Sequence, residues 1–67
     1  MKIKLNNQVK VFPEQCTVQQ LLDDVAPDKQ KGIAIAVNYA VVPKTNWQKH
    51  LINPDDEVMI ITATQGG

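Results

Sequence analysis

The sequence predicts an α+β domain, in which a small mixed sheet carries one main helix packed on one face. Two observations lead to this fold class. Short segments with the apolar patterning of strands surround a single stretch with the apolar periodicity of a helix. These segments follow one another in the order strand, strand, helix, strand, strand, turn, strand, with no repeat, linker or low-complexity segment between them. At 67 residues, the chain has the length of one domain.

Two strands joined by a tight turn are predicted at the start of the chain. Residues 2–5 alternate Lys-Ile-Lys-Leu, which is the period of a half-buried strand, and residues 8–12 resume a strand pattern. Asn6 and Asn7 lie between them, and asparagine tolerates the positive φ angles of a tight hairpin. Pro13 then ends the second strand, because proline has no backbone N–H for the ladder.

A helix is predicted from Thr17 to Ala26. Thr17 and Gln20 have the spacing of a capping box, in which each side chain bonds the backbone N–H of the other residue. Cys16 and Leu21 are placed to pack together as a hydrophobic staple at the same helix end. One apolar stripe has helical spacing and consists of Val18, Leu21, Leu22 and Val25. The proline that follows Ala26 stops the helix.

The second half of the chain alternates strands and turns. Three strand-like segments lie at residues 33–38, 41–42 and 58–61. Thr45 and Gln48 repeat the capping-box spacing, which predicts one helical turn over residues 46–50. Residues 53–56 suit a type I turn, with proline at its second position. The last segment is a continuous apolar run, as in a strand covered on both faces.

The same patterns predict which side chains are buried and which face outward. The expected core combines the helix stripe with one sheet face: Leu5, Val9, Val11, Leu21, Leu22, Val25, Ile33, Ile35, Val37, Val58 and Ile60. The opposite sheet face is expected to carry Lys2, Lys4, Ala34, Ala36, Met59 and Ile61. We predict that Met59 and Ile61, with the small Ala34 and Ala36 beside them, bind a partner, because exposed apolar patches are usually contact sites. The alternative is that Met59 and Ile61 are ordinary exposed apolar residues.

Composition excludes several classes of function. The 7 lysines, with no arginine, balance 7 acidic residues, which argues against nucleic-acid binding. No apolar run is long enough to cross a membrane, and the first residues lack the apolar segment of a signal peptide. The single cysteine fits a reducing compartment, so we expect a cytoplasmic protein, and we expect a monomer. A chain this short has little room for an active-site cavity beside its core, so we expect neither an enzyme nor a bound cofactor.

The chain ends in Gln65-Gly66-Gly67, and we expect these residues to form a flexible tail after a folded domain spanning residues 1–64. We expect Gly67 to carry a free α-carboxylate, which is ionised at neutral pH. Glycines have no side chains, so such a tail can enter a narrow channel in another protein. A carboxylate oxygen can attack the α-phosphorus of ATP to form an acyl-adenylate, and a sulfur nucleophile can then displace the nucleotide.

The lone cysteine and lone histidine are weaker candidates for chemistry. Cys16 precedes a helix N-terminus, which can lower a thiol pKa and make the thiol a sulfur-transfer nucleophile. Its position in the staple explains the residue without further assumptions, so we interpret Cys16 as structural. His50 has no cysteine or histidine at ligand spacing, so no metal site is predicted.

Several segments resemble one family across essentially the whole chain. Ile35-Ala36-Val37-Asn38, Val41-Val42-Pro43-Lys44 and Trp47 are similar to the sulfur carriers of thiamin thiazole synthesis, the ThiS family. The run Asp56-Glu57-Val58-Met59-Ile60 and the terminal Gly66-Gly67 also resemble this family. The chain departs from it at three positions, where the family often has a small or polar residue, arginine and glycine: Tyr39, Lys44 and Asp55.

The resemblance implies a ubiquitin-like β-grasp fold and a role as a substrate rather than an enzyme. A ThiF-like adenylating enzyme with bound zinc and ATP would adenylate Gly67. Sulfur that originates from cysteine, delivered through a sulfur donor protein, would replace AMP and leave a thiocarboxylate. Thiazole synthase would then take the sulfur into the thiazole ring. Sulfur and thiamin enter only through the resemblance, because the residues themselves indicate a reactive carboxylate, a thin tail and a docking face.

Three alternatives remain at this point. A molybdopterin-type sulfur carrier shares the fold and the tail, although such carriers tend to be longer. A ubiquitin-like modifier would use the same terminal glycine to form isopeptide bonds. A non-covalent β-grasp interaction domain would make the Gly-Gly end incidental.

Overall fold

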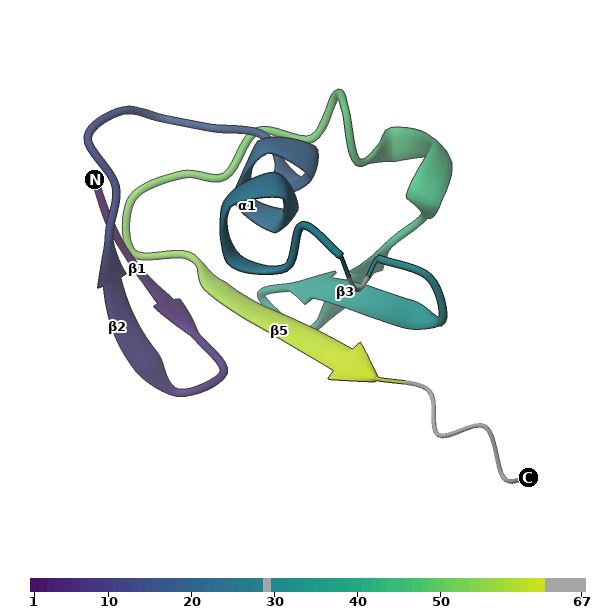
Figure 1. Ribbon diagram of the computed structural model, residues 1–67. Helices are drawn as coiled ribbons and strands as arrows, with labels where there is room; N and C mark the ends of the chain where they lie inside the picture. The colour runs from purple at the N-terminus through teal and green to yellow at the C-terminus, as the bar shows by residue number, and fades with distance from the viewer. Residues whose placement is uncertain (29, 63–67) are drawn as a thin grey trace.

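The computed structural model describes residues 1–28 and 30–62, which form a five-stranded sheet with a helix across one face (Figure 1). The elements are β1 (Lys2–Leu5), β2 (Gln8–Val11), α1 (Val18–Val25), β3 (Ile33–Val37), β4 (Ala40–Val42), the 3₁₀ turn η1 (Lys44–Asn46) and β5 (Glu57–Thr62). The strand order is β2-β1-β5-β3-β4. β1 and β5 are parallel, and the other neighbours are antiparallel. The predicted α+β class is confirmed, and the first and last strands are parallel neighbours at the centre of the sheet.

The β1–β2 hairpin has the predicted turn but corrects the predicted core. Asn6 and Asn7 have φ angles of 48° and 68°, as a two-residue turn requires. A turn of this length pairs Lys4 with Val9, and residues paired across an antiparallel ladder lie on the same face. Val9 is therefore on the outer face with the lysines, where it is 61% exposed. Val11 pairs with Lys2 in the same way and is 73% exposed, so the expected burial of both valines was wrong.

The helix begins as predicted. The Gln20 N–H donates to Thr17 Oγ1 at 3.1 Å, and the Thr17 N–H donates to Gln20 Oε1 at 2.9 Å, which completes the capping box. The two N–H groups at the start of α1 are satisfied from a distant segment, since Val18 donates to the His50 carbonyl and Gln19 to the Trp47 carbonyl.

In the part of the chain that the structure describes, no helix is long and apolar enough to cross a membrane.

The helical turn predicted over residues 46–50 is present, because the Asn46 carbonyl accepts from the N–H groups of Lys49 and His50, but the chain enters it differently from the prediction. η1 spans Lys44–Asn46 and has no side-chain cap, because Pro43 precedes it, so the capping box expected at Thr45 and Gln48 does not start this turn. Trp47 follows and is buried, with its Nε1–H donating to the Val42 carbonyl at 3.0 Å. This bond satisfies the indole N–H, the only polar group of this large buried side chain, and fixes the indole over the sheet.

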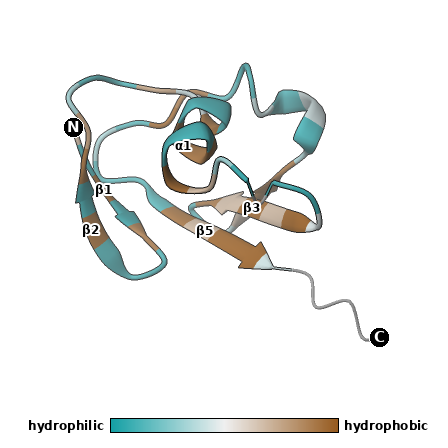
Figure 2. Cartoon of the chain, in the orientation of Figure 1, coloured by the Kyte–Doolittle hydropathy of each residue, from teal (hydrophilic) through white to brown (hydrophobic). Residues whose placement is uncertain are grey.

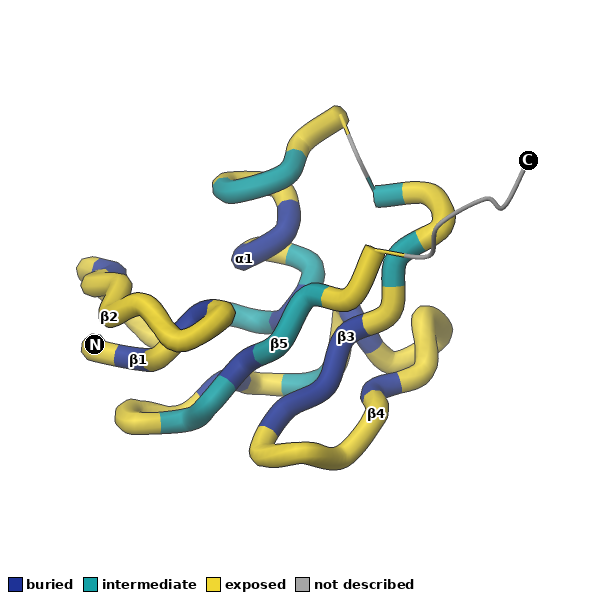
Figure 3. The backbone as a smooth tube through the Cα atoms, turned by 90° about the horizontal axis from the view of Figure 1, so that it is seen from below, coloured by how far each residue is buried: buried dark blue, intermediate teal, exposed yellow. Residues whose placement is uncertain are grey.

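The observed core is centred on the inner strands and the helix. Its buried residues are Ile3, Leu5, Phe12, Val18, Leu21, Leu22, Ile35, Val37, Val42, Trp47, Ile52 and Val58. Val25, Ile33 and Ile60, which were expected in the core, pack against it and are only partly buried. Figure 3 shows why β2 contributes little, since this edge strand is exposed along its whole length. Ile52 was not expected in the core, and it lies in the irregular segment between η1 and β5.

The turn before β5 is of a different type from the predicted one. The Asp56 N–H donates to the Asn53 carbonyl at 3.1 Å, which closes a β-turn with Pro54 at its second position. Asp55, at the third position, has a φ of 68°. A positive φ at this position defines a type II turn, so the type I prediction was wrong.

Replacing Asp55 with glycine should stabilise the protein. An L-residue at positive φ is strained and glycine is not, so Asp55→Gly should raise the free energy of unfolding by about 0.5–1 kcal/mol. In a domain of this size, about 1 kcal/mol shifts the melting temperature by about 4–8 °C. Thermal unfolding followed by circular dichroism measures the change. Glu14→Gly is the control: Glu14 is exposed and is not among the positive-φ residues, so it should lose stability. A lower melting temperature for Asp55→Gly would contradict the strain at this position.

Candidate functional site

The central strand β5 presents two faces with different surroundings. Its pairing with β3 sets Ile60 opposite Ile35 and Val58 opposite Val37, on the side that packs against α1. The alternate residue Ile61 pairs with Ala34, and these two share the outer face. In Figure 2, β5 is apolar over much of its length and β3 lies beside it.

The four residues predicted to bind a partner are brought together on this outer face. Met59 pairs with Ala36 and Ile61 pairs with Ala34, and we call these four residues the docking face. Ile61 is 47% exposed, Ala34 is exposed and Met59 is half-buried. Ala36 is only 5% exposed, so it forms the floor of the docking face rather than its contact surface. The neighbours of a small side chain can approach it closely, which explains its burial outside the main core.

Sequence reasoning missed further apolar residues on the same face. Val41 pairs with Ala36 across β3 and β4, and it is 69% exposed. Val9 and Val11 form a second apolar area on β2, separated from the docking face by Lys2 and Lys4 of β1. The signal that would have found the β2 valines is the hairpin itself, because a two-residue turn at residues 6 and 7 fixes which residues pair.

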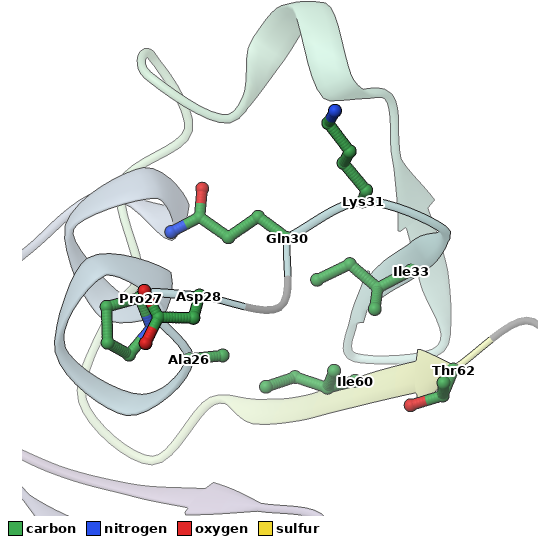
Figure 4. A pocket seen from close by; sticks show the side chains of 8 residues that line it. All are labelled: Ala26, Pro27, Asp28, Gln30, Lys31, Ile33, Ile60 and Thr62. Atoms are coloured by element: carbon green, nitrogen blue, oxygen red, sulfur yellow. The ribbon is translucent and has the colours of Figure 1, made fainter.

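The predicted tail lies outside the described residues. Gln65, Gly66 and Gly67 belong to this part, and Thr62, at the end of β5, is the last described residue before it. On the helix side of the sheet, a pocket of about 660 Å³ adjoins the end of β5 (Figure 4). It is lined by Ala26, Pro27, Asp28, Gln30, Lys31, Ile33, Ile60 and Thr62. Among the described residues that line it, the charged groups are the Asp28 carboxylate and the Lys31 amine, so these residues offer no nucleophile paired with a base.

The acidic residues at the start of β5 are engaged within the fold. The Tyr39 hydroxyl donates to Glu57 Oε2 at 2.7 Å, and Asn38 Nδ2 donates to Asp56 Oδ1 at 3.0 Å. The hydrogen bond to Glu57 and the charge of this carboxylate raise the pKa of Tyr39. These contacts join the β3–β4 turn to β5, so both carboxylates have a structural role.

Cys16 has the surroundings of a structural residue. It is half-buried and packs against the core, and its carbonyl accepts from the Ile52 N–H at 2.8 Å. Burial, and secondarily the Asp24 carboxylate, raise the pKa of the Cys16 thiol, which lowers the fraction of reactive thiolate at neutral pH. Within residues 1–28 and 30–62, no group of three or more His, Cys, Asp and Glu side chains is placed to hold a metal ion.

Comparison with known proteins places this arrangement in a family. The model of the ThiS family matches residues 2–67. The sulfur carrier protein ThiS of Escherichia coli (strain K12) is 30% identical over 67 residues, and the match covers 100% of both chains. A thiazole synthase of Paramagnetospirillum magneticum (strain ATCC 700264 / AMB-1) is also 30% identical over 67 residues, which make up 20% of its length.

A solved structure shares the fold over the whole chain. The crystal structure of the thiamine biosynthesis protein ThiS from Geobacter metallireducens superposes with a TM-score of 0.88 at 17% identity, covering 100% of both chains. This likeness confirms the ubiquitin-like β-grasp fold that the resemblance implied. Together with the match of the family model over residues 2–67, it leads to one conclusion: the chain belongs to the ThiS family.

Proposed function

We propose that this chain is a sulfur carrier protein of thiamin biosynthesis and that Gly67 is the residue that carries the sulfur. The observation that supports this most is the match to the Escherichia coli sulfur carrier ThiS over the full length of both chains. The Gly66-Gly67 end of the sequence supplies the chemistry. In this role the chain is a substrate for other enzymes, and it binds no cofactor of its own.

The chemistry takes place on the α-carboxylate of Gly67. One carboxylate oxygen attacks the α-phosphorus of ATP, which forms an acyl-adenylate and releases pyrophosphate. A sulfur nucleophile at the oxidation level of sulfide then displaces AMP and leaves a thiocarboxylate. We assign the first step to a ThiF-like adenylating enzyme and the second to a separate sulfur donor, in the cytoplasm. The similarity of one fifth of a thiazole synthase to this chain supports thiazole synthase as the acceptor of the sulfur.

The docking face has a definite task in this scheme. Ordering a tail residue inside a partner costs about 1–2 kcal/mol in backbone entropy, and more for glycine. Three ordered residues therefore cost several kcal/mol, and contacts elsewhere on the carrier must offset this cost. The docking face includes β5, the strand that leads into the tail, and a partner can reach the exposed Ile61 and Ala34 and the half-buried Met59. We propose that the adenylating enzyme binds there.

Charge on the docking face should weaken the complex with the adenylating enzyme. Ile61→Asp and Met59→Asp would place a carboxylate against an apolar partner surface, so the dissociation constant should rise about tenfold or more, which is about 1.4 kcal/mol. Isothermal titration calorimetry measures the affinity, and circular dichroism checks that each variant is folded. Ile61→Asp is the cleaner of the two, because Ile61 is the more exposed residue.

A matched control distinguishes the docking face from general surface hydrophobicity. Val11→Asp introduces the same charge on the same outer face, but on β2 beyond the lysines of β1. It should bind like the unmodified protein. Normal binding by both folded docking-face variants would refute this assignment, and so would an equal loss in Val11→Asp.

Changing the length of the tail should abolish adenylation and spare docking. Deleting Gly67 withdraws the carboxylate by about 3.3–3.6 Å, so it no longer reaches the α-phosphorus. One residue added after Gly67 moves the carboxylate past the phosphate. Gly66→Val should also block the reaction, because its branched side chain obstructs a narrow channel. ATP–pyrophosphate exchange with the adenylating enzyme measures the step, and the binding assay serves as the control. Normal exchange after deletion of Gly67 would overturn the carrier function.

Cys16 should be dispensable for sulfur transfer. Its raised thiol pKa makes it a poor nucleophile at neutral pH, so Cys16→Ala should transfer sulfur at a near-normal rate. The stability loss should be about 1 kcal/mol or less, because a small, half-buried side chain is removed. In the unmodified protein, alkylation of the thiol should accelerate only above the pH range of a free cysteine. Loss of transfer by a well-folded Cys16→Ala protein is the result that would make Cys16 a participant.

A further inference from the structure

Asn6 makes contacts that a turn residue does not need. Its backbone N–H donates to the Val58 carbonyl at 3.0 Å. Its side-chain Oδ1 accepts from the Ile60 N–H at 2.8 Å, and its Nδ2 lies 3.5 Å from the Ile60 carbonyl oxygen, a longer and weaker contact. The amide side chain thus offers an acceptor and a donor to one residue of β5, as the backbone of a neighbouring strand would.

These contacts lie where β5 extends beyond the end of β1, its parallel neighbour. The β1–β5 pairing covers Lys4 with Glu57 and Leu5 with Val58, after which β1 turns back into β2. β5 runs on to Thr62, and β3 pairs with it as far as that residue. Figure 1 shows β5 passing the end of β1 toward the C-terminus. The Asn6 side chain therefore continues the β1 side of the sheet by one more step along β5.

The requirement for positive φ does not account for this arrangement. Asn6 and Asn7 both have positive φ, at 48° and 68°, and glycine would satisfy that requirement at either position. The bond to Ile60 needs a side-chain oxygen at the first of the two positions. It is solvent-exposed, so water competes for it and its share in overall stability is small. Its consequence is local, because it holds Ile60 on the side where β1 has ended, while β3 pairs with β5 on the other side.

We propose that Asn6 is a positioning residue for adenylation of the carrier. Its side chain holds Ile60 in line with the sheet, and with it Ile61 of the docking face and Thr62, from which the chain continues to Gly67. The adenylating enzyme then meets a strand end that is already in place. Without the Asn6 amide, binding has to order this strand end as well as the tail, which weakens productive binding and leaves the chemical step unchanged. This role presupposes the carrier function proposed above.

Three variants of the same turn test the role of Asn6. Asn6→Gly keeps the backbone conformation and the N–H bond to Val58, and removes only the side chain. Asn7→Gly is the matched control, and Asn6→Asp keeps an oxygen for the Ile60 N–H and tolerates positive φ. Amide hydrogen exchange of the isolated protein by NMR reports on Ile60. ATP–pyrophosphate exchange with the adenylating enzyme gives KM for the carrier, and kcat.

Asn6→Gly should accelerate exchange of the Ile60 amide by about tenfold, because the amide loses its acceptor. It should raise KM about threefold or more with kcat little changed, the sign of lost binding rather than lost chemistry. Asn7→Gly should match the unmodified protein in both measurements, and Asn6→Asp should restore both. Unchanged Ile60 exchange, or a KM equal to that of Asn7→Gly, would overturn the role of Asn6. No exchange with the unmodified protein would instead refute the carrier function itself.

Discussion

The pairing of the first strand with the last is the constraint on which the rest of this fold depends. β5 lies at the centre of the sheet, with β1 on one side and β3 on the other. Without the β1–β5 contact, the β1–β2 hairpin would have no neighbour, and an isolated two-stranded hairpin is marginally stable at best. The hydrogen bonds along this contact include the Lys4 N–H to the Asp56 carbonyl and the Asn6 N–H to the Val58 carbonyl. β5, from which the chain continues to Gly67, is therefore held by β1 at Glu57 and Val58 and by β3 as far as Thr62.

A second constraint joins the helix to the irregular segment before β5. The first N–H groups of α1 bond to carbonyls at Trp47 and His50, and the Ile52 N–H bonds to the carbonyl before the cap. These bonds anchor a segment that has little regular structure of its own, and they bring Trp47 and Ile52 into the core. The single helix has 8 residues and covers the central strands, and this segment covers the rest of the core.

Local signals in the sequence predicted more than the burial pattern did. The capping box, the Asn6-Asn7 hairpin and the order of the elements along the chain were confirmed because each depends on neighbouring residues. The predicted burial of Val9 was wrong, because burial at this position depends on the length of the turn and on which element packs over the sheet. A helix is about 10–12 Å across and strands lie about 4.8 Å apart, so α1 shields the inner strands and not the edge strand β2. The docking-face residues were placed together by alternation alone, but no pattern in the sequence reveals the Asn6–Ile60 contact, which joins the two ends of the chain.

Family membership explains why this domain is built around presentation rather than catalysis. In the function that we propose, the carrier offers one carboxylate to more than one enzyme, so this group belongs on a segment thin enough for each of their sites. The folded domain then has to hold the start of that segment in a fixed position and to present a surface that partners can bind. β5 meets both needs, because its inner face is locked into the core by Val58 while Ile61 on its outer face remains exposed. The apolar surface that this requires carries a risk of self-association. The charged Lys2 and Lys4 between the two apolar areas oppose that association, because burying them against another copy would leave their charges unpaired.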